Sequence, residues 1–156
     1  MVLNFYDMHL SDSGRVALVK ERGVAYEGAE RMNNPTEIAE MAKNLLTLDR
    51  MAEEYVYMLA LDCVCHVMGL FMVSKGTVNL SVASPREIYI RALAIGAVKI
   101  VLFHNHPSGS ALPSEEDLRL TERVKGAGEL IGIPLADHII IGAGGTYLSF
   151  CEQNIL

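Results

Sequence analysis

Three stretches of the chain repeat apolar residues with the period of a helix, and each follows a residue that can cap one. These capping residues are Asn34, Ser84 and Ser114. The first two stretches have proline at the first helical position and glutamate at the third, which predicts capping boxes. The second stretch ends at Gly96, so it predicts a helix over residues 85–95. The third predicts a longer helix that contains two weakening glycines, Gly126 and Gly128.

The segment between the first two helices favours β-structure. Residues 53–82 are rich in β-branched, aromatic and aliphatic residues. This composition predicts two or three antiparallel strands, with turns near residues 62–66 and at Lys75-Gly76. Near the N-terminus, residues 14–23 are expected to add a strand at the edge of a sheet.

Two further segments complete the predicted sheet. Residues 98–103 form a short, mainly apolar run, typical of a strand that is covered on both faces. Residues 133–142 and 146–150 predict a hairpin around a glycine-rich turn. The pattern therefore predicts an α/β fold, with a mixed, mostly antiparallel β-sheet flanked by helices. We expect residues 1–33 to form an N-terminal leader with an edge strand, and residues 34–156 to form the main domain.

Composition and charge narrow the class of protein. With 156 residues, of which 51% are hydrophobic, the chain can bury one core. The net charge of −6 gives no field that would attract phosphate backbones, which disfavours nucleic-acid binding. No apolar run reaches the roughly 18 residues of a membrane span, and no secretory signal is visible. We therefore expect a cytoplasmic protein that does not enter a membrane.

The three cysteines form no recognisable framework. Their odd number and the lack of a Cys-x-x-Cys pair support neither a set of disulfides nor a cysteine zinc site. We expect free thiols, with Cys63 and Cys65 as small buried apolar residues.

Two histidines stand where the apolar run of residues 98–103 ends, in the sequence VLFHNHPSGSALPSEED. Side chains two residues apart on a strand point the same way, so His104 and His106 would present both imidazoles to one point. A turn follows, and Asp117 falls in the first turn of the next helix, from which its carboxylate can reach back. Two imidazoles and one carboxylate suit zinc with an open fourth position for water.

These residues also have purely structural explanations. Ser114 and Asp117 resemble a capping box, which accounts for both as the start of a helix and is compatible with a metal site. His138 is best explained as a hydrogen-bonded strand histidine or as a residue that supports a metal ligand. His9 and His66 carry weaker signals.

The segment HNHPSGSALPSEED reproduces the signature of the JAMM/MPN metalloproteases, His-x-His followed by seven residues and Ser-x-x-Asp. Flanking segments such as SPREIYIRALAIGAVKIVLF and AGELIGIPLADHIIIG resemble the RadC-like bacterial branch of that superfamily. The resemblance implies a single MPN/JAB-like domain with cytidine-deaminase-like layering. It also implies Zn²⁺ held by His104, His106 and Asp117, with Ser114 as a catalytic residue.

The superfamily implies one more catalytic residue, a glutamate at the start of an upstream strand that acts as general base. Glu53 and Glu54 both stand at such a place. RadC-like proteins have this glutamate eight residues before an aspartate that corresponds to Asp62, which selects Glu54 and keeps Glu53 in reserve. Both could also simply face solvent at the entrance of a strand. Glu87 is a third candidate, but its place in a predicted capping box explains it more simply.

The sequence departs from RadC-like proteins in two places. RadC-like proteins usually have a polar turn that contains lysine and asparagine, whereas this chain has the apolar segment DCVCHVMG at the same place. Substrate contacts of that turn can therefore not be transferred to this chain. The helix-hairpin-helix module of longer RadC relatives has no counterpart in these residues, so we do not expect the DNA contacts of that module.

Together these features predict a zinc-dependent hydrolase of the JAMM type that cleaves an amide, peptide or isopeptide bond in a peptide or protein substrate. One alternative is a metal-dependent DNA-processing protein, which the repair-related name of the RadC family suggests and the acidic charge opposes. Another is a non-catalytic MPN interaction domain, which the intact set of metal ligands opposes.

Overall fold

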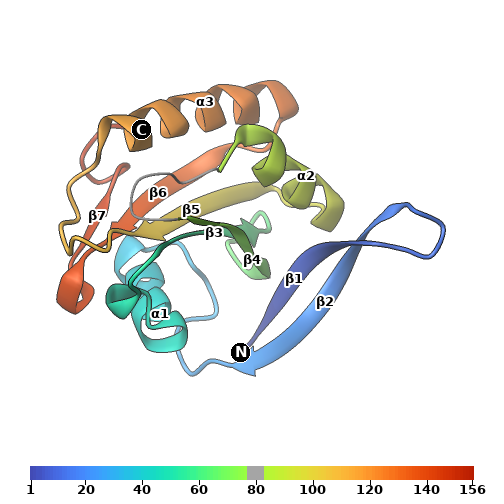
Figure 1. Ribbon diagram of the computed structural model, residues 1–156, viewed down its shortest axis with the longest axis horizontal. Coiled ribbons are helices and arrows are strands. Elements are labelled where there is room, and N and C mark those ends of the chain that lie inside the picture. The colour runs from blue at the N-terminus through green and yellow to red at the C-terminus, as the bar shows by residue number, and fades with distance from the viewer. Residues whose placement is uncertain (77–82) are drawn as a thin grey trace.

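The computed structural model describes residues 1–76 and 83–156. Its strands form one mixed sheet with helices on both faces (Figure 1). The strands are β1 (Val2–Leu10), β2 (Val16–Ala25), β3 (Glu54–Leu61), β4 (Val67–Gly76), β5 (Lys99–Asn105), β6 (Leu135–Ile141) and β7 (Tyr147–Ser149). The helices are α1 (Pro35–Leu46), α2 (Pro85–Ile95) and α3 (Glu115–Ile131), with 3-10 turns η1 (Leu48–Arg50) and η2 (Ala143–Gly145). Within the described ranges, no helix has the length and apolar character needed to cross a membrane.

The sheet has the order β2-β1-β4-β3-β5-β6-β7. Two neighbouring pairs are parallel, β1 with β4 and β5 with β6, and the others are antiparallel. This confirms the predicted α/β class and the mixed, mostly antiparallel sheet. The predicted edge position of β2 is confirmed as well, because β2 is the outermost strand beside β1.

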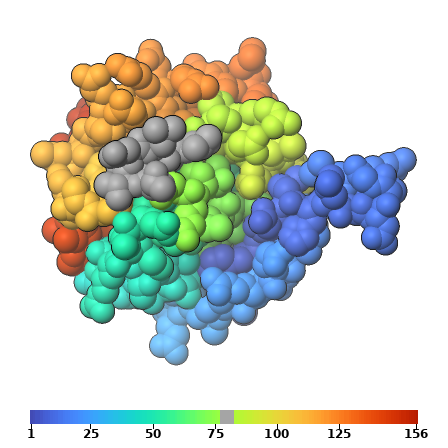
Figure 2. Space-filling model, in the orientation of Figure 1, coloured from blue at the N-terminus to red at the C-terminus, as the bar shows by residue number. Residues whose placement is uncertain are grey.

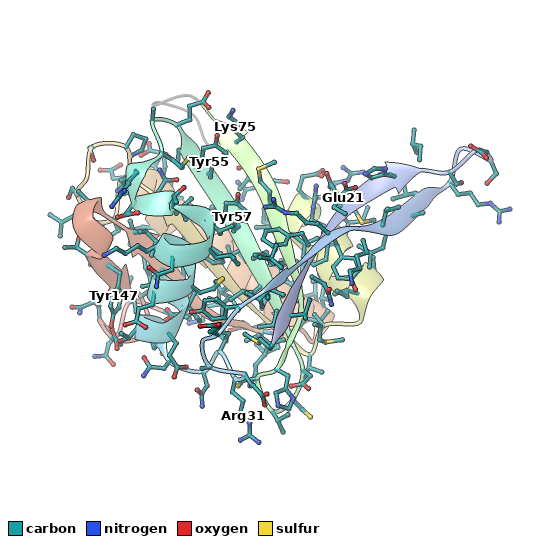
Figure 3. The ribbon with its side chains drawn as sticks, turned by 90° about the horizontal axis from the view of Figure 1, so that it is seen from below. Glu21, Arg31, Tyr55, Tyr57, Lys75 and Tyr147 are labelled. Atoms are coloured by element: carbon teal, nitrogen blue, oxygen red, sulfur yellow. The ribbon has the colours of Figure 1, made fainter. Side chains whose placement is uncertain are left out.

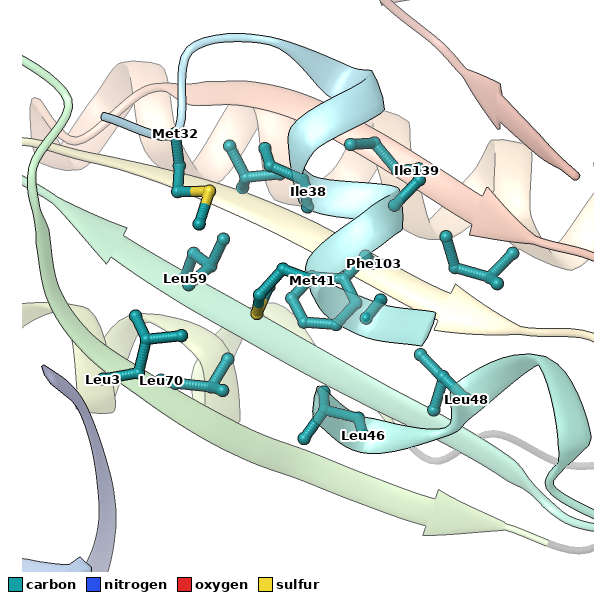
Figure 4. Packing of buried hydrophobic residues seen from close by; sticks show 14 of the residues in the cluster. Leu3, Met32, Ile38, Met41, Leu46, Leu48, Leu59, Leu70, Phe103 and Ile139 are labelled. Carbon is teal, nitrogen blue, oxygen red and sulfur yellow. The ribbon is translucent and has the colours of Figure 1, made fainter. Parts of the chain in front are cut away.

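The two faces of the sheet bury separate cores. α1 covers one face, whereas α2 and α3 lie on the other (Figure 1). Side chains alternate along β3 and β5, so Leu59 and Phe103 pack with Met41 of α1 (Figure 4). Met58 and Leu102 instead join the core below α2 and α3. The same alternation decides which polar side chains meet near α3.

The N-terminal caps of α1 and α2 are simpler than the predicted capping boxes. Asn34 Oδ1 accepts a hydrogen bond from Thr36 N at 2.9 Å, and among the described residues no bond returns from Glu37 to the cap. The carboxylate of Glu87 contacts Arg91 at 3.5 Å instead of turning back. The prediction of these two boxes is therefore wrong, although the caps are present, and α2 has the predicted bounds.

The strand predictions need two corrections. The turn expected at Lys75-Gly76 is wrong, because both residues belong to β4 and pair with Tyr55 and Glu54. The possible third strand of this region falls on residues 77–82, which lie outside the described residues. In addition, the sequence pattern did not predict β1. This strand buries Leu3 and Phe5 and pairs with β2 in a hairpin that projects from the molecule (Figures 1 and 2).

The prediction that Cys63 and Cys65 are buried is also wrong. They lie in the turn between β3 and β4, where Asp62 Oδ1 accepts hydrogen bonds from Val64 N and His66 N, both at 2.9 Å. Cys63 is exposed and Cys65 is half-buried, because a tight turn at the end of two strands leaves its side chains in solvent. All three cysteines are free thiols, as predicted.

The helix α3 continues through both of its glycines, but the two have different surroundings. A Cβ at Gly128 would meet the Tyr89 hydroxyl and would lie 2.6 Å from the Ile133 carbonyl oxygen, whereas a Cβ at Gly126 would meet nothing within 4 Å. We expect Gly126→Ala to raise the free energy of unfolding by about 0.5–1 kcal/mol. Gly128→Ala should lower it, because α2 packs against the bare backbone at this position. Urea titrations of both variants test this pair, and stabilisation by Gly128→Ala would contradict the close packing.

Candidate metal centre

The C-terminal end of β5 carries the two histidines of the candidate site. β5 is a central strand, and His104 pairs with Val56 of β3, so its side chain is 1% exposed. His106 follows the end of β5, where its N–H donates to Ile141 O at 3.1 Å. Gly109 N donates to His106 O at 2.9 Å and has a φ of +82°, a conformation that favours glycine, so the chain turns back here.

The first turn of α3 brings the carboxylate to these histidines. Ser114 Oγ accepts from Asp117 N at 3.1 Å, while Asp117 Oδ2 accepts from Ser114 N and from Ser114 Oγ, both at 2.7 Å. This is a complete capping box. The same carboxylate lies 3.1 Å from His104 Nε2 and 3.2 Å from His106 Nε2. Asp117 is therefore both a helix-capping residue and a member of the cluster.

The cluster is compact enough to hold one metal ion. His104 Nε2 and His106 Nε2 lie 3.0 Å apart, and Asp117 approaches them with its two oxygens, Oδ1 at 3.1 Å from His104 Nε2 and Oδ2 at 3.2 Å from His106 Nε2. Ligands that bind tetrahedral zinc at about 2.0–2.1 Å lie about 3.3 Å from one another, close to these values. Among the described residues, His104, His106 and Asp117 form the group that could hold a metal ion.

The Asp117 carboxylate and the neutral form of His106 suit a cation. His106 Nδ1 lies 2.9 Å from the Ser110 carbonyl oxygen, which can only accept, so a neutral His106 turns the Nε2 lone pair toward the site. The contact with Asp117 raises the pKa of His106, against the opposing effect of burial. Burial alone would raise the pKa of Asp117, but the contacts with His104, His106 and Ser114 outweigh it and hold this pKa well below its usual range. The carboxylate is therefore charged at neutral pH.

Glu54 begins β3 on the side of the sheet that carries the cluster. Since Val56 pairs with His104 in antiparallel register, Glu54 lies opposite His106 just beyond the ladder. The charge of Glu54 contributes to raising the pKa of His106. All five predicted site residues line one cavity of about 680 Å³: Glu54, His104, His106, Ser114 and Asp117.

Glu53 points in another direction. Its carboxylate binds Lys75 Nζ at 2.7 Å and lies 3.4 Å from the Tyr55 hydroxyl. Figure 3 shows Tyr55 and Lys75 side by side at this end of the sheet, where the ammonium lies over the aromatic ring. Of the two competing glutamates, Glu54 lies in the cavity with the histidines and Glu53 is not among its lining residues.

Asn105, which stands between the two histidines, joins β5 to the start of β3. Its side chain is buried, accepts from Tyr55 N and donates to Glu53 O, both at 2.9 Å. These two backbone groups flank Glu54, so one amide fixes the strand on both sides of it. The sequence shows the asparagine but gives no sign of this contact, because the contact depends on the pairing of two strands that are distant in sequence.

Two further buried residues lie behind His104. The sequence did not predict the hydrogen bonds that join them to it. His138 of β6 places Nε2 2.9 Å from His104 Nδ1, and Thr121 of α3 places Oγ1 2.7 Å from His138 Nδ1. Complete burial lowers the pKa of His138 well below its ordinary value. His138 thus agrees with the expectation of a hydrogen-bonded strand histidine, and it lies beside a candidate metal ligand.

The fold and the cluster together define a JAB-type α/β domain with a candidate metal centre. Residues 32–155 match the family described as RadC-like JAB domain, and the chain therefore belongs to this family. A UPF0758 protein of Pelobacter propionicus is 38% identical over 135 residues, which cover 86% of this chain and 58% of that protein. A UPF0758 protein of Clostridium tetani is 42% identical over 104 residues, or 67% of this chain and 45% of that protein. The chain thus spans about half the length of these relatives.

Proposed function

We propose that this chain is a zinc-dependent hydrolase of the JAMM type, which uses water to cleave an amide, peptide or isopeptide bond. One observation carries this proposal: the metal-ligand atoms of three side chains lie within 4.8 Å of one another, in the same cavity as Glu54. Membership of the RadC-like JAB family supports it, because the JAB superfamily includes metalloproteases.

In this proposal His104, His106 and Asp117 hold the zinc ion. When bound, zinc supplies a Lewis acid that lowers the pKa of water from about 15.7 to about 7. Glu54 takes the proton of the attacking water and later delivers it to the leaving nitrogen, which cannot leave as an anion. The Asn105 side chain, which bonds the backbone on both sides of Glu54, keeps this residue beside the histidines during both proton transfers.

Ser114 is proposed to stabilise the oxygen of the scissile carbonyl as this atom gains negative charge. Its hydroxyl donates to Asp117 Oδ2, but the same oxygen also accepts from Ser114 N. The hydroxyl can therefore turn toward a substrate while the carboxylate keeps a hydrogen bond. One donor of this kind is worth about 2.7–4 kcal/mol in the transition state.

A peptide or protein is the proposed substrate. The cavity of about 680 Å³ falls within the usual range of ligand sites, roughly 300–1,000 Å³. Its lining includes Glu116 as well as Arg119 and Arg123, so it offers both signs of charge to a polypeptide. The net charge of −6 opposes the approach of a nucleic-acid backbone.

Protein supplied with zinc is expected to contain about one zinc ion per chain, because the cluster offers one set of three ligands. Elemental analysis measures this ratio. The same preparation should cleave a proteome-derived peptide mixture, with new amino termini counted by mass spectrometry. A chelator should stop the cleavage, and added zinc should restore it.

His104→Ala and His106→Ala should abolish zinc retention in this experiment. His9→Ala is the matched control, because His9 is an exposed histidine that pairs with Glu21 at 2.7 Å, far along the chain from the site. Wild-type protein that stays free of zinc after supplementation would refute the proposal. Cleavage that continues unchanged in chelator would refute it equally.

A further inference from the structure

A chain of buried side chains leads from His104 back to the start of α3. His104 Nδ1 lies 2.9 Å from His138 Nε2, and His138 Nδ1 lies 2.7 Å from Thr121 Oγ1. Thr121 Oγ1 donates to the backbone carbonyl of Asp117 at 2.7 Å. His104 is 1% exposed, His138 0% and Thr121 4%, so solvent does not offer these atoms alternative partners. We call His104, His138 and Thr121 the histidine relay.

The last contact fixes the direction in which each hydrogen bond of the relay runs. The Asp117 carbonyl oxygen carries no hydrogen, so the Thr121 hydroxyl must donate to it and can only accept from His138. His138 therefore carries its proton on Nδ1 and, as a neutral ring, has a lone pair on Nε2. This lone pair accepts from His104, whose proton must lie on Nδ1.

This order of protons is the one that a metal ligand requires. With its proton on Nδ1, a neutral His104 directs the Nε2 lone pair toward His106 and Asp117. The opposite tautomer would put a proton on Nε2, where the metal is expected to bind. Outer partners of ligating histidines commonly set the tautomer in this way. Here the partner is a second histidine, whose own tautomer is set by a threonine of another element.

We propose that Thr121 and His138 are positioning residues that hold His104 in the metal-binding tautomer before any metal arrives. This inference rests on the metal site of the proposed function. The relay also links two ligands, because it begins at the His104 ring and ends at the backbone of Asp117. Docking of α3 against β6 therefore prepares both ligands together.

Thr121→Val is the sharpest test, because valine keeps the branched shape and removes the hydroxyl. His138 Nδ1 then loses its acceptor, so His138 can move its proton to Nε2 and force His104 into the opposite tautomer. We expect zinc affinity, measured by competition with a chelating dye, to fall by about 10–100-fold. Thr121→Ser restores the hydroxyl and should recover most of the affinity.

Val124→Ala provides the control for packing. Val124 lies in the same helix, is 0% exposed and is not part of the relay. This variant should melt at a lower temperature than the wild type and bind zinc with unchanged affinity. A purely structural role for Thr121 predicts the same behaviour for Thr121→Val, and zinc binding by Thr121→Val within twofold of the wild type would overturn the inference.

A spectroscopic measurement keeps the inference testable even if Thr121→Val does not fold. Long-range ¹H–¹⁵N spectra of the imidazole rings distinguish the two tautomers, and single histidine variants assign the signals. Metal-free wild-type protein should show His104 and His138 with the proton on Nδ1. His104 with its only proton on Nε2 would overturn the inference. If the wild type binds no zinc, the proposed function fails, whereas these spectra still test the relay.

Discussion

Replacing Glu54 by glutamine is expected to lower the rate of peptide hydrolysis by about 100- to 10,000-fold, the usual contribution of a general acid–base group. Glutamine has nearly the same shape but cannot take the proton of the attacking water. Zinc content should remain at the wild-type level, because the ligand cluster consists of His104, His106 and Asp117. The measurement combines cleavage of the proteome-derived peptide mixture with elemental analysis of the same sample.

Glu53→Gln is the matched control for this experiment. It makes the same chemical change one residue away, at a side chain that binds Lys75 instead of lining the cavity. We expect its hydrolysis rate to stay close to that of the wild type. Loss of activity in Glu53→Gln together with an active Glu54→Gln would reverse the assignment of the general base.

The sequence predicts much of this site because its strongest signals are local. Caps at Ser84 and Ser114 mark where helices begin, and the histidine pair stands at the end of a short apolar strand. Alternation on a strand is enough to place His104 and His106 together. The Ser114–Asp117 spacing predicts the capping box, and the box itself turns the carboxylate toward the strand end.

Contacts between distant segments were not predictable in this way. Side-chain alternation puts Glu53 and Glu54 on opposite sides of β3, but the pairing of Val56 with His104 decides which of them meets the histidines. The resemblance to RadC-like proteins selected Glu54, whereas local pattern alone left both open. Likewise, His138 reaches His104 because two parallel strands pair at a register that no short segment encodes.

The local signals also failed where tertiary structure overrides them. Alternating apolar residues usually predict burial, yet Cys63 and Cys65 lie in a solvated turn that Asp62 stabilises. The glutamate of a predicted capping box can form ion pairs with other side chains instead, as Glu87 does with Arg86 and Arg91. Such errors concern surface turns and helix ends, where few contacts fix the chain, and they leave the candidate site unaffected.

Replacing Asp117 by asparagine is expected to separate the two roles that this residue combines. The asparagine oxygen can still accept from Ser114 N and Ser114 Oγ, so the helix cap persists. The ligand charge is lost, and the new amide NH₂ can donate to the His104 Nε2 lone pair. Zinc affinity should therefore fall by more than the roughly 10–100-fold that loss of an outer partner costs.

Ser114→Ala is the matched change in the same capping box and should give the opposite result. Loss of the serine cap should cost about 0.5–2 kcal/mol of stability while the three metal ligands remain. Zinc titrations and melting curves recorded in chelator measure the two effects separately. If Asp117→Asn binds zinc like the wild type, Asp117 serves the start of α3 alone, and the metal site must be built from other residues.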